Sequence, residues 1–132
     1  METIVRIKIL SNDLSPEEIS RRLRQQPDRS WNKGTADPKV SRNMSKFNAW
    51  ILNSGLPKDA RIEDQVAALL EKVRPVGKEI LEISANETVD FSCVVYSDAE
   101  PPIYFDNKTL GAIASLGANL DVDLYLQTKT EP

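Results

Sequence analysis

The feature that most constrains the fold is the alternation of apolar and polar residues near both ends of the chain. Near the start, the charged Arg6 and Lys8 separate apolar neighbours. In residues 120–127 the apolar positions are Leu120, Val122, Leu124 and Leu126. A period of two residues is typical of a β-strand with one face in the core and the other in water. We therefore predict strands over residues 4–10 and 120–127, and we expect the apolar face of the last strand to be buried.

Helix signals lie between these two segments. Ser15 precedes Pro16 and Glu18, which is the pattern of a capping box. In this motif the Ser15 hydroxyl accepts a hydrogen bond from the Glu18 N–H, and the Glu18 carboxylate reaches back to Ser15. Pro27 predicts that this first helix ends near Gln26, because proline interrupts the helical hydrogen bonds.

A longer helix is predicted from an apolar stripe at helical spacing, formed by Ile62, Val66, Leu69, Leu70 and Val73. Pro75 then predicts a break and a short continuation. After it, Thr109 and Gly117 indicate the start and the end of a short helix.

Further strands are predicted over residues 47–53, 88–97 and 103–105, on either side of the long helix. Such interspersed strands and helices favour an α+β fold: a two-layer sandwich with a mainly antiparallel sheet and helices on one face. We expect residues 1–132 to form a single domain, since we find no linker or repeat. The polar stretch over residues 34–46 is expected to be an exposed loop.

The 132 residues contain no histidine and one cysteine, Cys93. Histidine is the commonest metal ligand and the side chain best suited to proton transfer near neutral pH. Its absence excludes Ser-His and Cys-His nucleophile pairs, so we expect no catalytic activity, no metal and no cofactor. Cys93 shares a predicted strand face with Phe91 and Val95, which predicts a buried, inert thiol.

A cytoplasmic location is expected from the single cysteine and from the segments that we do not find. One cysteine cannot form a disulfide within the chain, which favours a reducing compartment. We find neither a signal peptide nor an apolar stretch of about 20 residues that could cross a membrane.

Charge is divided unevenly along the chain. Residues 1–60 contain 11 lysines and arginines against 7 acidic residues, whereas residues 61–132 contain 6 against 13. Such an asymmetry can produce a surface with two signs of charge that steers a charged partner. Alternatively, strands from both halves interleave and the charges mix.

The order of several short motifs resembles a known family. The motifs are Leu14-Ser15-Pro16-Glu17-Glu18-Ile19, Arg29-Ser30-Trp31-Asn32-Lys33-Gly34, Ala49-Trp50-Ile51-Leu52, Leu69-Leu70-Glu71-Lys72-Val73 and Leu120-Asp121-Val122-Asp123-Leu124-Tyr125. Together they are similar to the bacterial domain-of-unknown-function family four-two-seven-nine, over nearly the whole chain. The resemblance implies no reaction, cofactor or catalytic residue. Some relatives look like immunity proteins of bacterial toxin systems.

Carboxylates of the second half of the chain are our first candidates for a binding surface. Asp121 and Asp123 share one face of the last predicted strand, as Arg6 and Lys8 do on the first. Ion pairs between the two strands follow if these strands are neighbours. Otherwise the two carboxylates form an acidic patch with Asp90, Asp98 or Glu100.

From these residues we predict a protein-binding module without catalytic activity. Most concretely, it is an immunity or antitoxin-like protein whose acidic surface occludes the basic active-site region of a toxin domain. The candidate partner-binding residues are Asp90, Glu100, Asp121 and Asp123.

The alternative is a nucleic-acid or nucleotide-binding protein that uses the basic segment 29–46. Its candidate residues are Arg29, Trp31, Lys33, Arg42 and Lys46, with Trp31 as a stacking platform. An isoelectric point near 5.0 disfavours this alternative. Trp31 can instead be an anchor that packs the chain against the first helix.

An enzyme that uses carboxylates alone ranks last among the three functions. Paired catalytic carboxylates need a pocket, and Asp121 and Asp123 lie on a face that we expect to be wet. These two side chains also provide too few oxygen ligands to hold a metal ion by themselves.

Overall fold

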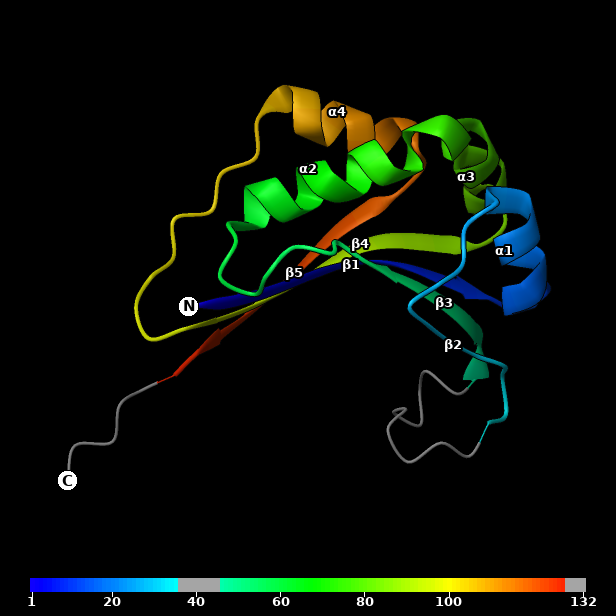
Figure 1. Cartoon of the computed structure of the whole chain (residues 1–132), viewed down its shortest axis with the longest axis horizontal. Coiled ribbons are helices and arrows are strands. Elements are labelled where there is room, and N and C mark those ends of the chain that lie inside the picture. Colours follow the sequence, from blue (N-terminus) through cyan, green and yellow to red (C-terminus); the bar gives the residue numbers. More distant parts are fainter. Residues whose placement is uncertain (36–45, 128–132) are drawn as a thin grey trace.

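The structure is a computed structural model that describes residues 1–35 and 46–127, and in it all the helices lie on one side of a curved sheet (Figure 1). The strands in this part of the chain are β1 (Glu2–Ser11), β2 (Arg29–Trp31), β3 (Asn48–Asn53), β4 (Thr88–Ser97) and β5 (Asn119–Leu126). Their order across the sheet is β2-β3-β1-β4-β5, and every pair is antiparallel except β4 with β5. The predicted α+β, mainly antiparallel fold is confirmed.

The helix layer consists of α1 (Pro16–Leu23), α2 (Ile62–Val73), the 3-10 turn η2 (Arg74–Val76), α3 (Gly77–Ser84) and α4 (Asn107–Ser115). The predicted break at Pro75 is confirmed, since η2 separates α2 from α3. No helix in the described residues is long and apolar enough to cross a membrane.

The main core lies between the helices and the helix-side face of the sheet. On this face the register brings Val5 beside Cys93 and Ile7 between Phe91 and Leu52. Core members from the helix layer are Ile19, Leu23, Ile62, Val66, Leu69, Val73, Val76, Ile80, Ile83 and Ile113. The Cys93 side chain is fully buried here, as predicted.

The first helix confirms half of the predicted capping box. The Ser15 hydroxyl accepts from the Glu18 N–H at 3.1 Å. The Glu18 carboxylate does not complete the box: it pairs with Arg21 and Arg22 on the next turn. The predicted end near Gln26 is also wrong. The helix ends at Leu23, because Arg24 adopts a left-handed conformation (φ 51°) that stops it before Pro27.

Two predictions between β4 and β5 are wrong. Residues 103–105 form no strand; Pro101 and Pro102 lack the amide donors a strand needs, and this segment runs over the surface before α4. The cap of α4 is Asp106 rather than Thr109. The Asp106 carboxylate accepts from the Thr109 N–H at 2.8 Å, and this bond lowers the pKa of Asp106. The helix ends at Ser115, and Gly117 follows it in the predicted left-handed conformation, with a φ of 69° that suits glycine.

The strand order keeps the two halves of the sequence apart. β2, β3 and β1 come from residues 1–60 and form one side of the sheet, whereas β4 and β5 come from the later, acidic half. β4 therefore separates the first and last strands, so the ion pairs expected between neighbouring β1 and β5 do not form. One side of the sheet therefore comes from the basic half of the sequence, and the other side comes from the acidic half.

Candidate functional site

The last strand is the outer strand of the sheet, and most of its side chains are exposed. Leu120 packs partly against the core, but Val122, Leu124 and Leu126 are 37%, 44% and 58% exposed. The expectation that this apolar face is buried is therefore wrong. Because β5 is parallel to β4 with Cys93 beside Val122 and Val95 beside Leu124, the three side chains lie on the helix side of the sheet. We call Val122, Leu124 and Leu126 the apolar row.

The length of α4 explains why the apolar row is uncovered. A helix of 9 residues is about 14 Å long, and a strand of 8 residues is about 26 Å long. The helix that connects β4 to β5 is therefore about half as long as β5 and is too short to cover the whole strand. In Figure 1 the far end of β5 extends beyond the helix layer toward the C-terminus. These lengths are the signal in the sequence that could have predicted the exposure.

The opposite face of β5 carries the predicted carboxylates. Asp121 lies beside Ser92 and Asp123 beside Val94, both on the sheet face without helices, which we call the open face. Asp90 is on the same face of β4, and its carboxylate accepts from the Asn119 side chain at 2.9 Å. Glu100 lies beyond the end of β4. The structure thus brings together Asp90, Asp121 and Asp123 but leaves Glu100 outside their row.

Cations occupy the neighbouring strand on the open face. Lys8 lies beside Asp90, and Arg6 lies beside Ser92, which in turn is next to Asp121. Among the described residues, the ion pairs within 4.0 Å all lie elsewhere, on α1, on α2 and at its ends. Arg6 and Lys8 therefore form a basic stripe next to an acidic edge whose outer carboxylates, Asp121 and Asp123, are exposed.

Tyr125 fixes the outer strand to its neighbour on this face. Its ring stacks on Tyr96 with centroids 5.2 Å apart and an interplanar angle of 17°. The Tyr125 side chain is still 53% exposed. The acidic edge and an accessible aromatic ring therefore lie on the same face of one strand.

The basic candidates lie at the other edge of the sheet, on and after β2. Trp31 is 7% exposed and packs with Leu10, Ala49 and Ile51 on the open face, with the Arg29 guanidinium 5.3 Å from its ring. Trp31 is thus an anchor, but on the face opposite to α1. The tryptophan that packs under α1 is Trp50, whose indole N–H donates to Ser20 at 3.0 Å.

The remaining basic candidates are dispersed. The Lys33 ammonium donates to the Asn12 carbonyl at 3.2 Å, and Lys46 is exposed before β3. Arg42, and most of the predicted loop, lie outside the described residues. Little of the Trp31 ring is accessible for stacking with a base, because the residue is buried and the Arg29 guanidinium lies over the ring.

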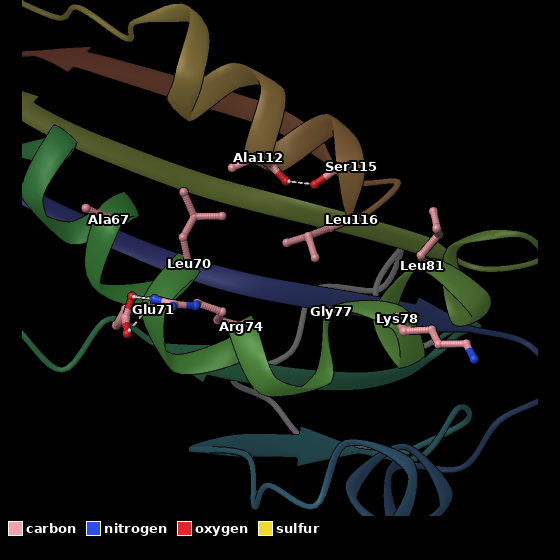
Figure 2. Close-up of a pocket in the computed structure, with 10 residues that line it drawn as sticks. All are labelled: Ala67, Leu70, Glu71, Arg74, Gly77, Lys78, Leu81, Ala112, Ser115 and Leu116. Atoms are coloured by element: carbon pink, nitrogen blue, oxygen red, sulfur yellow. Dashed lines mark hydrogen bonds and ion pairs between the residues drawn. The ribbon is translucent and has the colours of Figure 1, made fainter.

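A groove of about 500 Å³ lies in the helix layer, between α2 and α3 on one side and α4 on the other (Figure 2). Leu70 and Leu116 point into it, together with Ala112. The polar groups at its rim are largely satisfied by each other: Arg74 pairs with Glu71 at 3.2 Å. The Ser115 hydroxyl donates to a backbone carbonyl at 2.7 Å. The groove thus offers apolar surface without a converging set of reactive groups.

Reactive side chains are not assembled elsewhere in the described residues. Burial, with a smaller contribution from the charge of Asp121, raises the pKa of the Cys93 thiol to about 12, which keeps it protonated. In the residues that the structure describes, no three acidic or thiol side chains are placed to hold a metal ion. The uncovered outer strand is therefore the feature that we take as the candidate site.

Comparison with known proteins places the chain in a family. The family model described as "Domain of unknown function (DUF4279)" matches residues 1–127. No curated protein and no solved structure matches the chain significantly. The match covers nearly the whole sequence and confirms the predicted resemblance. The chain belongs to this family.

Proposed function

We propose that this member of the DUF4279 family is a protein-binding module without catalytic activity, and that β5 is its binding surface. One observation carries the proposal: the outer strand exposes apolar side chains on one face and carboxylates on the other. Of the large apolar side chains that are exposed in the described residues, four are on β5: Val122, Leu124, Tyr125 and Leu126. Concentration of exposed apolar groups in one place, beside polar ones, is typical of a protein interface.

The negative charge of this surface favours a basic partner. Asp121 and Asp123 are exposed at the edge of the acidic half of the sheet, and Asp90 continues the row inward. Complementary charges increase the association rate of two proteins and set their orientation. We therefore propose that the partner presents lysines or arginines to this edge.

Within this class, our proposal is an immunity or antitoxin-like protein of bacteria that acts in the cytoplasm. Its partner would be a toxin domain with a basic active-site region, and inhibition would result from occlusion by the acidic edge. Support comes from the exposed carboxylates and from the single, buried cysteine, which is compatible with a reducing compartment.

The test is a comparison of three forms of the tagged protein in lysate of the native host. They are the wild type, the double variant Asp121→Lys/Asp123→Lys, and a control with the same charge change at exposed helix positions, Asp64→Lys/Glu82→Lys. Bound proteins are identified by mass spectrometry at low and moderate salt.

The proposal predicts a stoichiometric, salt-sensitive protein that the wild type and the helix control retain and the β5 variant loses. Retention of the same proteins by all three forms would remove β5 from the function. Retention of RNA or DNA in place of a protein would favour the nucleic-acid alternative.

A further inference from the structure

The backbone of β5 has one set of groups directed at β4 and another directed outward. The Gln127 N–H donates to the Ser97 carbonyl at 2.7 Å, so the main chain of Gln127 faces β4. Successive residues of a strand direct their N–H and C=O groups to alternate sides, so those of Asp121, Asp123 and Tyr125 face β4 as well. The N–H and C=O groups of Val122 and Leu124 face outward, where no strand of the described residues pairs with them.

The outward backbone groups and the apolar row belong to the same residues. A strand that paired with this edge would form main-chain hydrogen bonds with Val122, Leu124 and Leu126. Its side chains on the helix side would lie beside the apolar row, and its side chains on the open face would lie beside Asp121 and Asp123. An added strand would thus meet two different chemistries on alternate residues.

A second copy of β5 fits this edge poorly. If two β5 strands paired antiparallel about a twofold axis at Val122, Asp121 of each copy would lie opposite Asp123 of the other on the open face. Like charges on adjacent strands are destabilising. Acidic side chains on an outer strand are also a known protection against edge-to-edge association of identical sheets.

We infer that β5 recognises its partner by strand addition, and that the partner segment is an extended strand in which basic and apolar residues alternate. The inference rests on the proposed function and specifies how its surface is used. The basic residues pair with Asp121 and Asp123, and the apolar residues extend the core beyond Leu124. Main-chain hydrogen bonds to the outward groups supply the rest of the affinity.

A peptide probe tests the inference without the native partner. We use a blocked peptide of about ten residues that alternates lysine and valine, and measure its affinity for the full chain by isothermal titration calorimetry. Two matched peptides serve as controls. In one, glutamate replaces lysine. In the other, alternate backbone amides are methylated, which removes the hydrogen-bond donors along one edge of the peptide without changing its charge or its side chains.

The wild type is expected to bind the lysine-valine peptide and to bind the methylated peptide at least about tenfold more weakly, the equivalent of a few lost main-chain bonds. The glutamate peptide should not bind. Equal affinity for the methylated and unmethylated peptides would overturn strand addition, as would no binding of the lysine-valine peptide.

A pair of protein variants separates the backbone from the side chain. Leu124→Pro removes an amide that faces outward and leaves the bonds to β4 in place, whereas Leu124→Ala removes only the apolar side chain. Circular dichroism and the amide exchange of β4 verify the fold of each. We expect Leu124→Pro to weaken binding of the peptide about tenfold. Leu124→Ala should weaken binding by a factor several times smaller.

The two proposals can fail separately. If the native partner is lost with Asp121→Lys/Asp123→Lys but retained by Leu124→Pro, β5 binds a protein through its side chains, and strand addition is wrong. If both variants retain the native partner as well as the wild type does, the proposed function fails at this surface, whether or not the peptide binds.

Discussion

The Tyr125 ring stacks on the Tyr96 ring across the only parallel strand pair of the sheet in the described residues, with centroids 5.2 Å apart. This contact lies near the end of β5, where the helix layer no longer covers the strand. Few buried apolar contacts support that end, so the ring pair and the β4 hydrogen bonds hold the proposed surface in place.

Removing the Tyr125 ring should loosen the end of β5. We expect Tyr125→Ala to lower the free energy of unfolding by about 0.5–1.5 kcal/mol, the usual size of an aromatic pair. Urea denaturation measures the change, and a double-mutant cycle with Tyr96→Ala isolates the pair. Tyr104→Ala is the matched control, because Tyr104 is 75% exposed. Equal losses for both variants would show that the stacking contributes nothing.

The buried Gln65 side chain should be critical for stability. Its Oε1 accepts from the Val5 N–H at 3.3 Å and from the Ser54 hydroxyl at 2.9 Å, and its Nε2 donates to the Thr3 carbonyl at 2.8 Å. Gln65→Leu keeps the volume but removes these bonds from buried groups, so we expect a loss of about 2–4 kcal/mol.

Thermal and urea unfolding measure the effect of Gln65→Leu. The control is Gln25→Leu, since Gln25 is exposed after α1 and its change should remain within about 0.5 kcal/mol. A loss of stability no larger than that of the control would contradict the role that we assign to the Gln65 hydrogen bonds.

The Cys93 thiol should be inert in the folded protein. Burial and the nearby charge of Asp121 raise its pKa to about 12, so little thiolate forms near pH 8. A maleimide reagent should therefore label Cys93 only as fast as the protein unfolds. A Cys93→Ser/Tyr104→Cys protein, with its thiol at an exposed position, should react within the mixing time at the same pH. Fast labelling of wild-type Cys93 would show that the thiol is accessible.

The same raised pKa predicts a loss of stability in alkali. The unfolded thiol loses its proton near its ordinary pKa of 9.0, whereas the folded thiol holds it to about 12. The unfolded state therefore binds fewer protons above pH 9, and stability falls as pH rises through this range. Cys93→Ala should reduce this dependence in urea titrations, and an unchanged pH dependence would contradict the assignment.

Glu18 should stabilise the protein in a pH-dependent manner. Hydrogen bonds from Arg21, then Arg22, lower the pKa of its carboxyl from 4.5 to about 2. A lowered folded-state pKa stabilises above the unfolded value and loses that effect as pH falls from 4.5 toward 2. The stability difference between wild type and Glu18→Gln should shrink over this range. Glu17→Gln, an exposed neighbour on the same turn, should show a smaller change; identical pH profiles would contradict the pairing.

Local sequence patterns predicted most of the fold. The alternation around Arg6, the apolar stripe of α2, the Pro75 break and the Ser15 cap all report on short-range geometry, and each is found. The Glu18 carboxylate departs from the capping-box pattern, because two arginines one turn away compete for it. Residues 103–105 resemble a strand in composition, but the two preceding prolines prevent pairing.

The site was only partly predictable, because it depends on long-range pairing. The alternation of Leu120 to Gln127 is that of a strand with one buried face, and nothing in the alternation itself shows that β5 is an outer strand. The position of Asp121 and Asp123 on one face was predictable from the period of two. Their grouping with Asp90, and the separation of Glu100, follow only from the register of β4 with β5.

Residue-resolved amide hydrogen exchange of β5 determines whether the outer edge of the sheet is free. We expect the N–H groups of Asp123, Tyr125 and Gln127 to exchange slowly, because they face β4, and those of Val122, Leu124 and Leu126 to exchange fast. Equal protection of both sets would show that another element already occupies the edge, and would contradict the claim that β5 is free to bind a partner.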